Sequence, residues 1–139
     1  MSRKHRQRHL GKRTLGEGNW LRLEEVEYLD HNGTARTWEA TVRRGPGGAA
    51  FMIARLVPSE RYILVRQYRP PADGLVLEFP AGLLDPGEDP ATTAVRELRE
   101  ETGYTGTITW AGPMALSSPG SSREGVCLLL MEVDEEAPE

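Results

Sequence analysis

Residues 82–104 read GLLDPGEDPATTAVRELREETGY, and the rest of the chain is organised around them. The second half of this stretch predicts one amphipathic helix. Asp89 suits the N-cap, Pro90 the first helical position, and Gly103 a left-handed cap at the C-terminus. Apolar residues recur at helical spacing on the face expected to pack inward, namely Ala91, Ala94, Val95 and Leu98.

The same helix carries a cluster of carboxylates, because Glu97, Glu100 and Glu101 stand at positions i, i+3 and i+4. On an isolated helix, like charges at this spacing repel each other by roughly 0.2 to 0.5 kcal/mol per pair. On an ordinary helix such a face would be a solvated acidic surface. Here the helix follows a loop that carries Gly and Pro, and Glu88 stands just before its cap. Because Mg²⁺ takes oxygen ligands and shares them with substrate phosphates, we interpret the cluster as a metal-dependent phosphate site.

Fixed residues at fixed spacing in this stretch match the Nudix box, G-x5-E-x7-R-E-U-x-E-E-x-G-U, where U is a bulky apolar residue. The matching residues are Gly82, Glu88, Arg96, Glu97, Leu98, Glu100, Glu101, Gly103 and Tyr104. The ending at Tyr104 resembles that of the ADP-ribose pyrophosphatase branch of the Nudix family. Segments outside the box resemble that branch too: RTLGEGNW (13–20), RTWEA (36–40), VRQYRPP (65–71) and EFPAGLLDPGE (78–88).

Length and composition suit one compact domain, since the chain has 139 residues, 38% hydrophobic and 27% charged. The single Cys127 excludes an internal disulfide. No apolar run is long enough to span a membrane or to form a signal sequence. We therefore expect a protein of the reducing cytoplasm that does not associate with membranes.

Basic residues are concentrated at the N-terminus. Six of the 17 lie within residues 1–13 without an acidic residue, so the other 11 face all 21 acidic residues. Because no aromatic residue is interleaved, we interpret residues 1–13 as a disordered, solvated arm and do not expect a nucleic-acid partner. The acidic residues 132–139 are interpreted likewise as a frayed terminus.

The order of predicted elements gives the fold class. Residues 14–44 predict a β-hairpin with a turn at Asn32-Gly33, and Gly and Pro in residues 43–48 mark a boundary. Residues 45–139 would form the main domain, with strands at 49–56, 62–69, 75–79, 107–112 and 125–133 and a polar loop at 116–124. Strands on both sides of a central helix indicate an α/β (α+β) fold with a mixed sheet. The resemblance implies a Nudix-type α/β/α sandwich with an N-terminal β-hairpin.

The resemblance also implies a metal site. Glu97 and Glu101 would be direct ligands of Mg²⁺, with Mn²⁺ as a possible substitute. Glu100 would lie close to a second ion, and the backbone carbonyl of Ala81 would complete the ligand shell. The three glutamates would thus also be the catalytic residues. Arg96 is expected to pair with a carboxylate of the box, such as Glu88, rather than to touch the substrate.

Substrate contacts follow from the same resemblance. Trp20 and Trp38 match two tryptophans that hold an adenine between them, one from each subunit of a homodimer that exchanges its N-terminal hairpins. Glu39 matches an acid that hydrogen-bonds the base, and Arg69 an arginine that contacts phosphate. A proline of the branch lies in a Ser-Pro-Gly loop, here Ser118, Pro119 and Gly120. Without the resemblance, the tryptophans would be interpreted as hairpin core or dimer contacts, and Arg69 as an exposed residue at a strand end.

The implied activity is Mg²⁺-dependent hydrolysis of ADP-ribose to AMP and ribose 5-phosphate. These enzymes usually continue with a further strand, a helix and a loop that carries a catalytic glutamate, whereas this chain ends at Glu139. We expect a shortened C-terminus, water activation by a box residue such as Glu100, or a non-catalytic module that binds ADP-ribose. The box is equally compatible with a pyrophosphatase for another nucleoside diphosphate sugar, such as GDP-mannose, and with a nucleoside triphosphatase. The tryptophan pair and Pro119 disfavour the triphosphatase.

Overall fold

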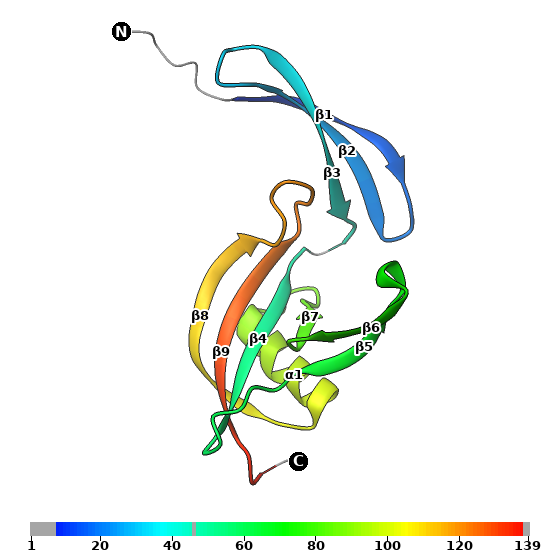
Figure 1. Ribbon diagram of the computed structural model, residues 1–139. Coiled ribbons are helices and arrows are strands. Elements are labelled where there is room, and N and C mark those ends of the chain that lie inside the picture. The colour runs from blue at the N-terminus through cyan, green and yellow to red at the C-terminus, as the bar shows by residue number, and fades with distance from the viewer. Residues whose placement is uncertain (1–7, 46, 138–139) are drawn as a thin grey trace, which may run out of the picture. The chain divides into compact units, whose positions relative to one another are not determined.

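The computed structural model describes residues 8–45 and 47–137 and divides into two compact units (Figure 1). Among the described residues, the N-terminal unit combines residues 8–45 with residues 116–124, and the second unit holds residues 47–115 and 125–137. No helix within the described ranges is long and apolar enough to cross a membrane.

The N-terminal unit is an antiparallel sheet of three strands in the order β1-β2-β3. These are β1 (Arg8–Glu17), β2 (Leu21–Leu29) and β3 (Ala35–Arg43). Strands β2 and β3 pair without a register shift, from Leu21 opposite Arg43 to Leu29 opposite Ala35. The Asp30 carboxylate holds the turn between them, because it accepts hydrogen bonds of 2.9 Å from the backbone N–H groups of Asn32 and Thr34. Such a local bond is the reason that Asp and Asn favour turns.

Strand β1 corrects the prediction for the N-terminus. A disordered arm over residues 1–13 is wrong for residues 8–13, which form the first part of β1 and pair with β2; residues 1–7 lie outside the described residues. The N-terminal piece therefore has three strands rather than the two of a hairpin. Ion pairs from Lys12 to Glu24 (3.2 Å) and from Arg13 to Glu25 (2.7 Å) match the basic strand to an acidic neighbour. The frayed acidic terminus is wrong in its first residues, because β9 continues to Asp134; residues 138–139 are not described.

The second unit contains a mixed sheet of four strands in the order β7-β4-β9-β8. The strands are β4 (Ala49–Val57), β7 (Ala81–Leu83), β8 (Gly106–Leu116) and β9 (Gly125–Asp134). Strand β4 pairs in parallel with β9 and antiparallel with β7, so the predicted mixed sheet is confirmed. A separate two-stranded ribbon consists of β5 (Val65–Arg69) and β6 (Gly74–Glu78), which the short 3₁₀ helix η1 (Pro70–Ala72) connects.

Helix α1 (Pro90–Thr102) packs on one face of this sheet (Figure 1). Every second residue of β4 is buried, which is the pattern of a strand with one face on a core. The buried core consists of alternating residues of β4 and β9 with Ile63 and two helix residues: Ala50, Met52, Ala54, Leu56, Ile63, Ala94, Leu98, Cys127, Leu129, Met131 and Val133. This arrangement confirms the α+β class. Of the two helical layers in the expected sandwich, residues 8–45 and 47–137 contain one.

Candidate active site

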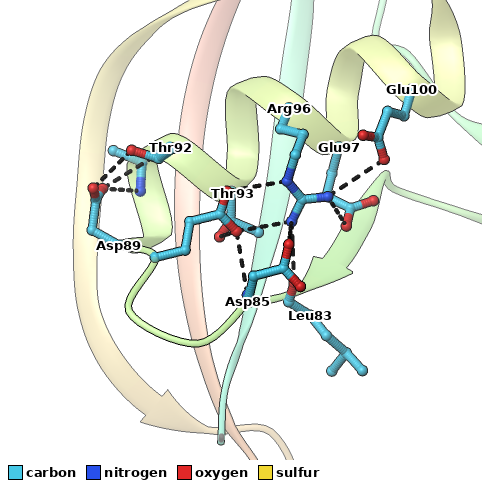
Figure 2. Close-up of polar contacts among 10 residues, drawn as sticks. Leu83, Asp85, Asp89, Thr92, Thr93, Arg96, Glu97 and Glu100 are labelled. Atoms are coloured by element: carbon cyan, nitrogen blue, oxygen red, sulfur yellow. Dashed lines mark hydrogen bonds and ion pairs between the residues drawn. The ribbon is translucent and has the colours of Figure 1, made fainter.

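The ends of α1 are fixed as the sequence predicts. The Asp89 side chain accepts hydrogen bonds from the backbone N–H groups of Ala91 (2.9 Å) and Thr92 (3.0 Å) and from the Thr92 hydroxyl (2.7 Å), as Figure 2 shows for Thr92. Gly103 ends the helix with a φ of 75°, and its N–H donates to the carbonyl of Arg99. A capping side chain of this kind contributes about 0.5–2 kcal/mol to stability. These caps therefore fix the residues at which α1 begins and ends.

Glu88 joins that loop to the helix through Arg96. Its carboxylate accepts hydrogen bonds from Arg96 Nε (3.1 Å) and Nη2 (2.8 Å) and from the buried hydroxyl of Thr93 (2.7 Å). The bonds from Arg96 and then Thr93 lower the pKa of Glu88 from 4.5 to about 2. The expected pairing of Arg96 with Glu88 is thus present, and it locks the loop against the helix.

Arg96 also contacts the acidic cluster, as its guanidinium reaches toward Glu97 and Glu100 in Figure 2. Its Nη1 donates to Glu97 (2.8 Å) and lies 3.4 Å from Glu100. Hydrogen bonds to Glu88 and then Glu97 raise the pKa of Arg96, so it stays charged. One arginine thereby offsets the repulsion among neighbouring carboxylates of the helix.

Glu97 lies directly against the backbone of Gly82 in β7. A Cβ atom at Gly82 would stand 2.2 Å from Cγ, 2.0 Å from Cδ and 2.3 Å from Oε1 of Glu97. Non-bonded carbon atoms normally stay about 3.5–4.0 Å apart. Only glycine at this position lets the Glu97 carboxylate come so close to the strand.

Glu101 lies one helical turn after Glu97 and faces the same strand. The pKa of Glu101 is raised, mainly by burial. A hydrogen bond from the backbone N–H of Ala81 partly offsets this effect, and the charge of Glu97 adds to it. Smaller contributions come from Arg69, which lowers the pKa, and from Glu78, which raises it. The structure thus gathers Glu97, Glu101, Ala81 and Arg69 in one place.

Glu78 is a member of this group that sequence reasoning missed. Arg69 at the end of β5 donates from Nε to Oε2 of Glu78 at the end of β6, at 2.8 Å. The signal in the sequence was a single acid in the otherwise apolar segment 75–79. This hydrogen bond holds the guanidinium of Arg69, whose charge lowers the pKa of Glu101.

The side chains of this group suit a divalent cation. Carboxylate oxygens are the ligands that Mg²⁺ and Mn²⁺ take in proteins. Glu97 can present its carboxylate beside the strand because residue 82 has no Cβ, and the charge of Glu97 already acts on Glu101. Among the described residues, however, no three His, Cys, Asp or Glu side chains form a ready-made metal cluster. The carboxylates of Glu97 and Glu101 fit a divalent cation, which these two residues would hold. In this structure Arg96 pairs with Glu97 and Glu100.

A second group of predicted residues meets in the N-terminal unit. The indole Nε1 of Trp38 donates to the backbone carbonyl of Gly120 at 2.8 Å, so β3 and the Ser118–Gly120 loop touch although they lie far apart in the sequence. Trp38 remains 54% exposed. Within the loop, the hydroxyls of Ser118 and Ser121 lie 2.9 Å apart. The indole edge is therefore fixed while much of the ring stays open for a ligand.

Trp20 does not join Trp38 in the same place. Trp20 is 76% exposed, and its carbonyl accepts from the N–H of Arg44. Trp38 stands opposite Val26 in β2. Because Arg44 lies opposite Trp20, and Trp38 precedes Arg44 by six positions, the two tryptophans lie at different points of the sheet. Glu39 is exposed on β3. Within one chain, the two tryptophans are separated along the sheet.

Residues 46–138 match the family model of the NUDIX domain. The chain belongs to the Nudix family. It is 39% identical to the ADP-ribose pyrophosphatase of Saccharomyces cerevisiae over 128 residues, which cover 86% of this chain and 55% of that protein. It is 41% identical to the ADP-sugar pyrophosphatase of Mus musculus over 115 residues, or 78% of this chain and 53% of that protein. The predicted resemblance to the ADP-ribose pyrophosphatase branch of the Nudix family is confirmed.

Two further matches agree with this assignment. An ADP-ribose pyrophosphatase of Bacillus subtilis is 38% identical over 112 residues, which cover 81% of this chain and 57% of that protein. The crystal structure of an ADP compounds hydrolase has a TM-score of 0.72 and 22% identity, and the match covers 100% of this chain and 77% of that one. This structural match supports the Nudix fold. The chain spans little more than half the length of these three curated relatives.

Proposed function

We propose that this Nudix protein hydrolyses ADP-ribose to AMP and ribose 5-phosphate with Mg²⁺, or Mn²⁺ in its place. The observation that carries the proposal is the close approach of Glu97 to Gly82, with Glu101 and Arg69 beside it. Carboxylates for a cation and a guanidinium for a phosphate are the two groups that cleavage of a diphosphate needs. The names of the relatives, ADP-ribose and ADP-sugar pyrophosphatases, support this class of substrate.

Each residue of the group has a role in the proposal. Glu97 and Glu101, with the carbonyl of Ala81, would hold the metal, which when bound neutralises phosphate charge and lowers the pKa of a bound water. Arg69 would donate hydrogen bonds to phosphate oxygens, a task that its planar guanidinium suits. We assign the general base to Glu100, whose side chain is 59% exposed against 17% for Glu97. Its carboxylate would take a proton from the attacking water.

The adenine would stack on Trp38, whose ring orientation the hydrogen bond to Gly120 sets. Arg44, which lies opposite Trp20, is six positions after Trp38, or about 20 Å along an extended chain at 3.4 Å per residue. Two rings that sandwich a base stand only about 7–8 Å apart. We therefore propose that the second tryptophan, Trp20, comes from another copy of the chain, and that Glu39 hydrogen-bonds the base.

Burial in the N-terminal sheet supports a homodimer. In residues 8–45 the one buried residue is Glu24, a charged one, so this sheet has no apolar core of its own. Large apolar side chains are exposed there instead, namely Leu10, Leu15, Trp20, Leu21 and Trp38. A small sheet needs an apolar surface to pack against, and a second copy can supply it. The expected cytoplasmic location stays a prediction.

A second candidate is a module that binds ADP-ribose without cleaving it. The observation that favours it is the pairing of Arg96 with both Glu97 and Glu100, together with the lack of a ready-made metal cluster among the described residues. In this arrangement the acidic groups stabilise the helix and the loop. The nucleotide contacts of Trp38 and Arg69 would be the same in both candidates.

One experiment separates these candidates. The purified chain is incubated with Mg²⁺ and, in turn, ADP-ribose, GDP-mannose and nucleoside triphosphates, with chelator as the control. We expect AMP and ribose 5-phosphate from ADP-ribose alone, and no product with chelator. Binding of ADP-ribose by calorimetry without any product would favour the second candidate. Clear cleavage of a triphosphate without ADP-ribose binding would overturn both.

A further inference from the structure

Glu24 in β2 is a buried carboxylate that the proposed chemistry does not use. Its side chain is 3% exposed and forms ion pairs with three basic residues. Oε1 accepts from Lys12 Nζ at 3.2 Å and from Arg22 Nε at 2.8 Å. Oε2 accepts from Arg123 Nη1 at 3.2 Å. A buried charge without such partners would be strongly destabilising, so the three contacts form one unit.

The partners of Glu24 come from different parts of the N-terminal unit. Lys12 lies in β1 and Arg22 in β2, whereas Arg123 lies 99 residues after Glu24, in the segment 116–124. The Glu24 carboxylate is therefore a link between the sheet and this distant loop. Arg123 binds Oε2 of Glu24, whereas Lys12 and Arg22 both bind Oε1. The link to the loop is therefore separate from the two bonds within the sheet.

Backbone hydrogen bonds also attach this loop to β3. The N–H of Thr41 donates to the carbonyl of Ser121 at 2.8 Å, and the N–H of Arg123 donates to the carbonyl of Thr41 at 3.1 Å. Thr41 and Ser122 form an isolated parallel bridge, so this segment lies beside β3 at that point. Gly120, which accepts the bond from the Trp38 indole, precedes this segment directly.

We infer that Glu24 is a positioning residue: through Arg123 it fixes the Ser118–Gly120 loop and thereby the orientation of the Trp38 indole. Lys12 and Arg22 neutralise and hold the carboxylate, and Arg123 transmits its position to the loop. This inference rests on the proposed function, because Trp38 and the loop are the proposed contacts of the adenine. Loss of the Arg123 side chain would remove this attachment and leave the loop held by the backbone bonds with Thr41 and by the Arg43–Glu124 ion pair, which would loosen the loop and weaken binding without touching the residues that hold the metal.

The chain offers a matched pair of variants. Arg123→Met and Lys12→Met each remove one positive charge and one bond to Glu24, but only the first removes the link between Glu24 and the loop. After Lys12→Met, Oε1 of Glu24 still accepts from Arg22. After Arg123→Met, Oε2 of Glu24 has lost the side-chain donor that it has among the described residues. Arg123→Lys keeps the charge and tests rescue.

The first measurement needs no ligand. Hydrogen exchange of the three indole N–H groups is followed by NMR, with Trp38 assigned by its loss in Trp38→Phe. In Arg123→Met we expect exchange of the Trp38 indole to accelerate by about tenfold or more, the effect of losing a hydrogen bond to a charged group. In Lys12→Met it should stay within about twofold of the wild type, and Arg123→Lys should lie between the two. Backbone amides of β2 and β3 report unfolding in the same sample. Equal effects in both Met variants, or loss of these amides together with the indole, would overturn the inference.

The second measurement is steady-state cleavage of ADP-ribose with Mg²⁺, or calorimetric binding if the chain does not turn it over. In Arg123→Met we expect KM or Kd to rise by about tenfold while kcat stays within about twofold, and in Lys12→Met neither should change. A fall in kcat alone would contradict a positioning role. If the wild type fails to bind ADP-ribose, the proposed function fails, whereas the indole exchange still decides whether Glu24 positions the loop.

Discussion

Gly82 and Glu97 touch so closely that a Cβ atom at residue 82 would stand 2.0 Å from the carboxyl carbon of Glu97. The φ angle of Gly82 is not positive, so its backbone accepts an alanine without strain. The clash is with the mobile end of a side chain, which can turn away. Substitution at Gly82 should therefore displace the carboxylate and leave the fold intact.

We expect Gly82→Ala to lower Mn²⁺ affinity and hydrolysis by about 10- to 100-fold, the range for groups that orient a metal ligand. The melting temperature in metal-free buffer should be close to that of the wild type. Titration with Mn²⁺ followed by electron paramagnetic resonance measures the affinity, and calorimetry measures the melting. Gly87→Ala is a control that probes backbone strain, because Gly87 has a φ of 81° and open space around its Cβ position. Wild-type Mn²⁺ affinity in Gly82→Ala would show that Glu97 is not a ligand.

Glu101→Gln should abolish hydrolysis and leave the protein folded. Burial and the charge of Glu97 raise the pKa of Glu101, so its ionised form is disfavoured in the folded protein without metal. Protonated Glu101 therefore contributes to stability at low pH, and this contribution is lost as the pH rises through its raised pKa. Glutamine stays neutral and avoids this loss. At pH 7 with chelator, we expect the variant to melt at the same or a higher temperature than the wild type. Full activity, or a clearly lower melting temperature with chelator, would argue against this role.

Glu88 should make the protein sensitive to acid. The pKa of Glu88 falls from 4.5 to about 2 on folding, because Arg96 and then Thr93 donate hydrogen bonds to its carboxylate. The stabilisation is fully present above about pH 4.5 and is lost as pH falls toward about 2. In Glu88→Gln, acid unfolding followed by circular dichroism should be less steep across this range, and stability at pH 7 should be lower. Exposed Glu27→Gln is the control, and an identical acid profile in both variants would contradict the role of the Arg96 pair.

The sequence predicts α1 well because its signals are local. Asp89 and Gly103 cap the helix, and the residues between them set its faces within one short segment. The contact of Arg96 with Glu88 is also short in sequence, eight residues, so the box and its main ion pair could both be foreseen. Local caps and periodicity are the kind of information that a single sequence carries.

In the N-terminal unit, the hairpin of β2 and β3 could be predicted from local signals, whereas strand β1 and the contacts with residues 116–124 could not. Strand β1 is basic and irregular, with register shifts between His9 and Gly11 and between Thr14 and Gly16 that break the alternating pattern of a strand. Its stability depends on pairing with β2. The link from Glu24 to Arg123 spans 99 residues, and no local pattern marks either partner.

The separation of Trp20 and Trp38 along the sheet predicts a binding site shared between two copies. Trp20→Ala and Trp38→Ala should each lose most ADP-ribose affinity as pure homodimers, because every site then lacks one stacking ring, worth about 1–3 kcal/mol. After subunit exchange in an equal mixture, half of the dimers combine one copy of each variant. Each of these has one site with both tryptophans, so about one quarter of all sites should bind like the wild type. Calorimetry measures this fraction, and light scattering checks that the wild type is a dimer at micromolar concentration. A mixture that recovers no binding sites, or a monomeric wild type, would exclude the shared site.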